Sequence, residues 1–268
     1  VLSFSGPIAM TSMLGFFLYN GFRLFLVDDL GLSEYGKFVA AYTIVAGSFG
    51  MVEQVTTAIH HPKIYREISR GSISSANAPW SKFIETMLVY LVGAMVLLIM
   101  IGAEISVVIF GDSIGDLVPY LKLAILLEFS RVVATSVLFY FQISKETVQL
   151  YLYYIIAVPV VLLCYQFLPW TDLVQAWVVS IILGICASLL IILIKLTRKK
   201  GFVNFGYSRI FVSAVTSVLL AYIIVFVTKD LLNIENSNYF IAISTCLFVP
   251  IFLIIDVIFD GRSVTGKI

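Results

Sequence analysis

The sequence predicts an all-α polytopic membrane protein, a helical bundle of about eight transmembrane helices. Of the 268 residues, 60% are hydrophobic and only 12% are charged, whereas a soluble domain carries about 25% charged residues. The mean hydropathy is +1.04. The apolar residues form long stretches, without the short alternating pattern of barrel strands. A soluble core could not bury this much apolar surface, so we expect the stretches to cross a bilayer.

Eight apolar stretches are each long enough to span a membrane. A hydrocarbon core of roughly 30 Å requires about 20 helical residues, and a helix satisfies its own backbone hydrogen bonds inside lipid. We expect two of the spans to be interrupted by proline, the fifth at Pro159 and the eighth at Pro250. The predicted spans lie near residues 7–27, 35–61, 83–103, 117–141, 149–168, 174–196, 207–228 and 237–259.

The connections between the spans alternate in charge, and this alternation orients the helices. Acidic residues dominate the odd-numbered connections, and basic residues collect in the even-numbered ones and at the C-terminal end. Basic connections stay on the cytoplasmic side. We therefore expect a multi-pass protein of the cytoplasmic (inner) membrane with both ends of this chain in the cytoplasm, a parity that eight spans satisfy. The basic residues of the even-numbered connections and of the C-terminal end are Lys63, Arg66, Arg70, Lys82, Lys145, Lys195, Arg198, Lys199, Lys200, Arg209, Arg262 and Lys267.

Two polar or mixed segments are the longest connections. Residues 62–82 are rich in Ser, Asn, Pro and Gly and are predicted to form a loop, whose first nine residues could continue as a short amphipathic surface helix. Residues 104–116 carry an apolar patch and are placed at the outer interface.

Five ionisable residues lie within the spans or at their margins. Arg23 is in the outer third of the first span, Glu53 lies toward the cytoplasmic side of the second, and Glu128 and Arg131 are near the middle of the fourth. Asp256 is near the cytoplasmic end of the eighth, at headgroup level. A charge at the bilayer centre costs at least about 2.5–3.5 kcal/mol. We expect the charges in the spans to face a bundle interior or a wet cavity.

Glu128 and Arg131 are three residues apart, so they share a helix face and can form an ion pair. Two interpretations stay open. The pair could be purely structural, or Arg131 could belong to a substrate path with Glu128 as its counter-ion.

Arg23 and Glu53 have no such partner on their own helices. Arg23 could pair with an acid on another helix, reach water, extend to the outer interface or bind an anionic ligand. Glu53 could carry a proton in an apolar site, and pairing with Arg23 would explain both residues equally well.

The second span contains small residues, among which Ala46 and Gly50 form a small-xxx-small pair that predicts a close helix contact. His60 and His61 are predicted to end this span before Pro62. Two adjacent histidines point in different directions on a helix, so a shared metal ion is not expected.

Other functional classes lack the residues they need. A net charge of +1 gives no clustered basic face for nucleic acid, and the three cysteines lie in apolar runs without metal-ligand spacing. Residues 261–267 match the glycine spacing of a phosphate-binding loop, but Ile268 stands where Ser or Thr must hold magnesium. We predict no cofactor, no metal and no nucleic-acid partner.

The first two spans and their connections carry a further pattern. A span begins with Pro after a short lead and has a polar residue near its outer end; a Leu-Gly…Tyr-Gly turn follows, and the next span ends in Pro with a basic, Ser-containing tail. Farther on, VVIFGDSIGDLVPYLKLAILLE contains a Phe-Gly segment that leads into the next span. The residues in these places are Pro7, Arg23, Leu30, Gly31, Tyr35, Gly36, Pro62, Ser69 and Arg70.

This pattern resembles the Wzx-type polysaccharide flippases of the multidrug/oligosaccharidyl-lipid/polysaccharide exporter superfamily. The resemblance covers residues 1–200 and implies a six-helix transporter lobe similar to the C-terminal one of the family's two lobes; residues 201–268 would add two transmembrane helices and a cytoplasmic tail. A second lobe, N-terminal or in a partner chain, is then expected, and we expect a fragment of a longer protein rather than a half-transporter.

The resemblance implies that the chain translocates a polyprenyl-diphosphate-linked oligosaccharide for surface polysaccharide biosynthesis. A diphosphate needs a cationic path, so Arg23 and Arg131 would bind the substrate. Glu53 and Glu128 would act in ion coupling or as counter-ions. The partners would be lipid-linked oligosaccharide and membrane lipid.

Two other functions remain as alternatives. A cation-coupled multidrug exporter of the same superfamily would use acidic residues in its cavity, such as Glu53 and Glu128. A membrane-embedded lipid or sugar transferase would need Asp, Glu or His clustered at one interface with a loop of catalytic size. Only residues 62–82 offer such a loop, and acids are sparse there, so we predict that the chain is not an enzyme.

Overall fold

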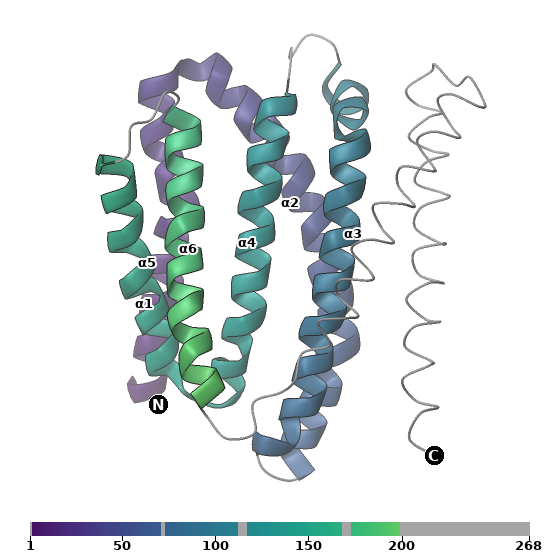
Figure 1. The fold of residues 1–268 in the computed structure, drawn as a ribbon, viewed down its shortest axis with the longest axis vertical. Helices are drawn as coiled ribbons and strands as arrows, with labels where there is room; N and C mark the ends of the chain where they lie inside the picture. The colour runs from purple at the N-terminus through teal and green to yellow at the C-terminus, as the bar shows by residue number, and fades with distance from the viewer. Residues whose placement is uncertain (1, 71–72, 112–116, 168–172, 199–268) are drawn as a thin grey trace, which may run out of the picture.

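The computed structural model describes residues 2–70, 73–111, 117–167 and 173–198, and their regular structure is entirely helical (Figure 1). The predicted spans 207–228 and 237–259, with Pro250 and Asp256, lie outside the described residues. The elements in chain order are α1 (Leu2–Phe16), the π-helical turn η1 (Phe17–Gly21), α2 (Phe22–Arg70), the 3₁₀ turn η2 (Ile73–Ala76), α3 (Asn77–Phe110), α4 (Val118–Ile143), α5 (Thr147–Phe167) and α6 (Leu173–Arg198).

Helices that are long and apolar enough to cross a membrane are present in this part of the chain. The described helical segments cover six of the predicted spans, except their end residues 117 and 168. Four described helices are long and apolar enough to cross a membrane, and a shorter apolar helical segment, Leu173–Leu189, follows them. The four are Gly31–Arg70, Asn77–Phe110, Val118–Ile143 and Val148–Phe167.

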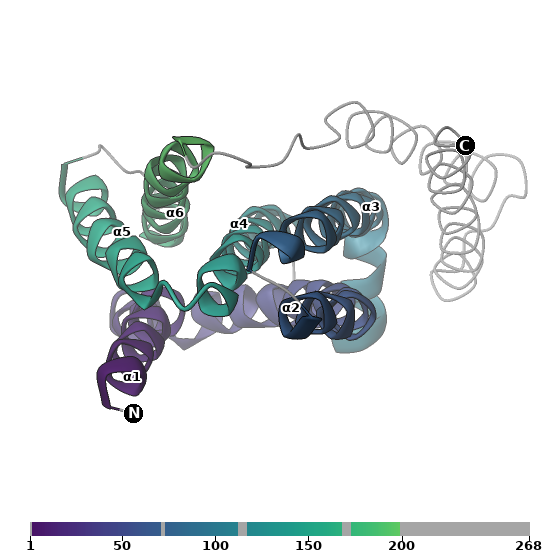
Figure 2. The same ribbon diagram turned by 90° about the horizontal axis from the view of Figure 1, so that it is seen from below.

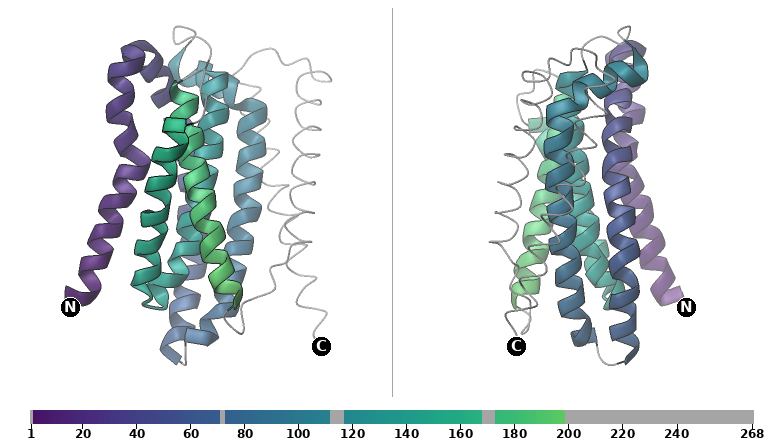
Figure 3. Two further views of the ribbon diagram at one scale, coloured as in Figure 1. Left: turned by 60° about the vertical axis from the view of Figure 1, so that its left-hand side comes forward. Right: turned by 90° about the vertical axis from the view of Figure 1, so that its right-hand side faces the viewer.

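The helix α4 forms the centre of the bundle. It contacts α2 and α3 on one side and α5 and α6 on the other, an arrangement visible along the helix axes in Figure 2. Of its most apolar stretch 61% is buried inside the protein, against 22–33% for the three other long helices. By contrast, α1 diverges from the bundle toward its N-terminal end (Figure 3). A larger share of α4 than of the other long helices is therefore held in the protein interior.

The connection between the first two spans is a single bend. Gly31 has φ 76° and ψ 158°, a backbone conformation that suits glycine, and helix continues on both sides of it. The predicted polar connection around residues 28–34 is thus a kink within α2.

The predicted loop at residues 62–82 is wrong for most of its length. α2 continues through Pro62 to Arg70, as the alternative of a helical extension allowed, and α3 already begins at Asn77. Between them the chain makes a short 3₁₀ turn, in which the Ser75 hydroxyl donates a 3.0 Å hydrogen bond to the Glu67 carbonyl.

The predicted interruption at Pro159 is also wrong, because α5 is one continuous helix from Thr147 to Phe167. Transmembrane helices accommodate proline through small local adjustments. The helix α3 likewise extends beyond its prediction, as far as Phe110, where Gly111 (φ 73°) ends it.

Candidate functional site: a charge network between α2 and α4

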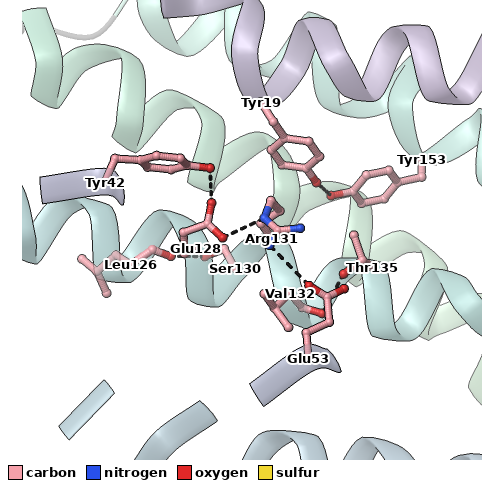
Figure 4. Close-up of polar contacts among 10 residues, drawn as sticks. All are labelled: Tyr19, Tyr42, Glu53, Leu126, Glu128, Ser130, Arg131, Val132, Thr135 and Tyr153. Atoms are coloured by element: carbon pink, nitrogen blue, oxygen red, sulfur yellow. Dashed lines mark hydrogen bonds and ion pairs between the residues drawn. The ribbon is translucent and has the colours of Figure 1, made fainter. Parts of the chain in front are cut away.

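The candidate site lies where α2 and α4 pack against each other. Tyr42 and Glu53 on α2 are eleven residues apart, close to three full helical turns, so both face α4. On α4, Glu128 and Arg131 occupy one face at a spacing of three. About 16 Å of helix rise separates Tyr42 from Glu53, and their side chains converge on the α4 pair from opposite ends (Figure 4).

Glu128 is completely buried, with 0% of its side chain exposed. The Tyr42 hydroxyl donates a hydrogen bond to its Oε1, and Arg131 Nε donates one of 2.8 Å to its Oε2. Both carboxylate oxygens therefore have a donor. A buried charge is tolerated when it is paired and hydrogen-bonded in this way.

Arg131 holds a second carboxylate more loosely. One of its terminal nitrogens, Nη2, lies 3.4 Å from Oε2 of Glu53. This contact joins two helices, whereas the pair with Glu128 lies within α4. The side chains are partly exposed, 23% for Arg131 and 33% for Glu53. The Arg131 guanidinium thus bridges the buried carboxylate of Glu128 and the partly exposed carboxylate of Glu53.

A pair of tyrosines adjoins this network. Tyr19, in the π-helical turn η1, and Tyr153, in α5, are both buried and share a hydrogen bond of 3.1 Å between their hydroxyls. The pair lies beside Arg131 in Figure 4. Because the two tyrosines are 134 residues apart, their contact has no local signature in the sequence.

Three of the four predicted site residues come together here. The predicted Glu128–Arg131 ion pair is confirmed. Glu53 forms an ion pair with Arg131. Arg23 lies near the start of α2, and its side chain is outside the described part of the structure. The two adjacent histidines both pack near Phe83 of α3; His60 is buried, and His61 also stacks on Phe139 of α4 with a centroid distance of 3.8 Å.

The predicted close contact at Ala46 and Gly50 is wrong within the described part of the chain, where a Cβ on Gly50 would meet no atom within 4 Å. The close approach is instead at Gly184 of α6. A Cβ there would lie 2.6 Å from Cγ2 of Val161 and 2.8 Å from the carbonyl oxygen of Ala157, both on α5. The signal was present in the sequence, since Ser180, Gly184 and Ser188 repeat at every fourth position.

An apolar cavity of about 140 Å³ lies beside the π-helical turn. Its walls come from η1, α5 and α6 and are formed by Phe17, Leu18, Gly21, Val158, Val161, Leu162, Trp177 and Ile181. It contains no charged side chain and is separate from the network around Arg131.

The chain matches no family model, no curated protein and no solved structure.

Proposed function

We propose that the chain is a membrane transporter that translocates a polyprenyl-diphosphate-linked oligosaccharide across the cytoplasmic membrane for surface polysaccharide biosynthesis. The observation that carries the proposal is an arginine in the interior of the apolar bundle, fixed by a buried glutamate yet partly exposed. A diphosphate cannot enter hydrocarbon without compensating charge, and guanidinium binds such oxyanions through paired hydrogen bonds. The lipid tail can remain in the bilayer.

Flipping requires the bundle to open and close around the headgroup, as in alternating access. The network offers a contact on which such a movement can act, because the Arg131–Glu53 contact joins α2 to α4 and is long and partly exposed. The second wall of the path would come from another six-helix lobe. The resemblance in residues 1–200 supports this cargo.

A flippase assay in proteoliposomes tests the proposal. The substrate is a fluorescent polyprenyl-diphosphate-linked sugar, and the readout is its accessibility in the outer leaflet. Arg131→Ala, alone and with Arg23→Ala, should reduce the rate by at least tenfold. Arg66→Ala removes an exposed cation far from the network and is the matched control. Full activity in the double variant would refute the anion role.

One observation favours a second candidate, a cation-coupled multidrug exporter of the same superfamily. Two carboxylates face one guanidinium, which leaves one negative charge uncompensated when both are ionised. An organic cation or a proton could use that surplus. Transport of tetraphenylphosphonium driven by a pH gradient, and lost in Glu53→Gln, would support this candidate over the flippase.

A further inference from the structure

Arg131 has two carboxylate partners, which differ in the helix that carries them, in burial and in contact distance. Glu128 lies on the same helix and is fully buried, with each oxygen holding a hydrogen bond. Because a spacing of three within one helix fixes this pair, a movement of α2 relative to α4 does not separate it. Glu53 approaches from α2, is one-third exposed, and touches only a terminal nitrogen of the guanidinium, at 3.4 Å.

The Glu53 carboxylate lies at a terminal nitrogen of the Arg131 guanidinium, where an anionic ligand could also bind. The Nε edge of Arg131 is committed to Glu128, which leaves the terminal nitrogens to face the accessible side. An oxyanion that binds arginine there would place its oxygens where the Glu53 carboxylate now lies. The carboxylate and a phosphate oxygen therefore compete for the same donors.

Charge supports the same conclusion. With both glutamates ionised, the three-residue cluster carries one net negative charge and repels an anion. Without the Glu53 contact, the remaining Glu128–Arg131 pair is neutral and has free N–H donors.

We propose that Glu53 is an internal competitor for an anion site on Arg131: a diphosphate group displaces the Glu53 carboxylate and, in doing so, weakens the interface between α2 and α4 by removing one of its polar contacts. This inference rests on the proposed function, since it names the residue that controls access to the proposed headgroup site. Glu53 is then a positioning residue that keeps the site closed until the cargo arrives. Glu128 only holds Arg131 in place.

Diphosphate binding to the purified full chain in nanodiscs tests the proposal. One arm titrates soluble inorganic pyrophosphate, and the other uses nanodiscs that contain farnesyl diphosphate, with farnesol as the blank. Glu53→Gln keeps the shape of the side chain and removes its charge. It should bind pyrophosphate about tenfold more tightly than the wild type, because it removes both a competitor and a repulsive charge.

The chain offers a closely matched control on the same helix. Glu34 is also partly exposed, pairs with a cation, Lys37, at 2.6 Å, and accepts a hydrogen bond from Tyr120 of α4. Glu34→Gln should leave diphosphate affinity unchanged. The double variant Glu53→Gln with Arg131→Gln should lose the gain, which shows that the gain acts through Arg131.

The outcomes separate the inference from the proposed function. Diphosphate binding by the wild type with no gain in Glu53→Gln, or an equal gain in Glu34→Gln, overturns the competitor role and leaves the transporter proposal standing. No binding by the wild type or any variant in either arm overturns the diphosphate cargo and the inference with it. A gain in both arms shows that the headgroup suffices, and a gain only with farnesyl diphosphate shows that the headgroup is bound from the bilayer.

A second variant keeps the test decisive if Glu53→Gln does not fold. Glu53→Asp retains the charge but is one methylene shorter, so it lengthens a contact that is already 3.4 Å. It should bind pyrophosphate about threefold more tightly than the wild type. Unchanged or weaker binding would overturn the proposal.

Discussion

Two helix interfaces in this bundle contain different kinds of contact. α2 and α4 meet through a charge network in which Arg131 bridges Glu128 and Glu53. α5 and α6 meet through small residues, with the backbone at Gly184 directly against α5. Inside lipid there is no hydrophobic driving force for two apolar helices to associate, so association depends on interhelical hydrogen bonds and close packing. The charge network lies in the α2–α4 interface, beside the stacking of His61 on Phe139, and the closest backbone approach lies in the α5–α6 interface.

The difference determines which interface can change. A contact between charges can be exchanged for another contact of the same chemistry, such as a ligand oxyanion in place of a carboxylate. A close backbone contact cannot be exchanged for a ligand contact in this way, because separating the two helices loses dispersion energy without forming a new interaction. The stacking of Trp177 of α6 on Tyr165 of α5, at 4.2 Å, adds to the packed interface. We therefore expect the bundle to move at α2–α4 and to remain rigid at α5–α6.

The largest effect is expected from removing the central cation. Arg131→Met leaves the carboxylate of Glu128 fully buried without its ion pair, and such a loss costs about 3–5 kcal/mol of folding free energy. The thermal unfolding midpoint in detergent should fall strongly. The double variant Glu128→Leu with Arg131→Met removes both charges and should recover most of the loss. An Arg131→Met protein as stable as the wild type would contradict the account of the network.

Removing the neutral donor should have a smaller effect. Tyr42→Phe deletes the hydrogen bond to Oε1 of Glu128 and leaves that oxygen without its donor, a loss of about 2 kcal/mol. Thermal unfolding under the same conditions measures it. Tyr65→Phe, on an exposed part of α2, is the control and should leave the midpoint unchanged. Equal midpoints for the two variants would show that the Tyr42 bond contributes nothing.

The packed interface should respond to a single methyl group. Gly184→Ala forces α5 and α6 apart, since the new Cβ would lie 2.8 Å from a backbone oxygen, and should cost about 1–2 kcal/mol. Gly47→Ala is the matched control, because a Cβ there meets nothing within 4 Å. Alanine also favours helix by up to about 1 kcal/mol. Gly184→Ala should thus lower the unfolding midpoint and Gly47→Ala should raise it. A shift of both midpoints in the same direction would contradict the close packing proposed at Gly184.

The sequence predicted those features that depend on local pattern. Apolar stretches located the helices, and a spacing of three predicted the Glu128–Arg131 pair, because residues three apart on a helix always share a face. The errors at residues 62–82 and at Pro159 have one cause. Serine, glycine and proline were taken to end helices, whereas tertiary packing and the lipid environment keep the backbone helical through them.

Contacts between helices could not be predicted in the same way. The sequence does not set the register of α2 against α4, so the bond from Tyr42 and the partner of Glu53 emerged only from the structure. Both α2 and α6 carry small residues spaced four apart, and only packing distinguishes Gly184, which is in close contact, from Gly50, which is not. The functional roles of Arg23, Glu53, Glu128 and Arg131 stay predictions.

Distance measurements between spin labels test most directly whether the charge-held interface is the one that opens. The three native cysteines are first replaced by alanine. One label pair is placed at the exposed Val55 of α2 and Leu126 of α4, and the other at the exposed Leu163 of α5 and Leu183 of α6. Both pairs are measured in nanodiscs with farnesyl diphosphate and with farnesol.

If the headgroup displaces Glu53 from Arg131, farnesyl diphosphate shifts the α2–α4 distance distribution to longer values and leaves the α5–α6 distribution unchanged. Glu53→Gln then produces part of the α2–α4 shift without the ligand. An unchanged α2–α4 distribution, or an equal shift in both label pairs, would contradict displacement at this interface.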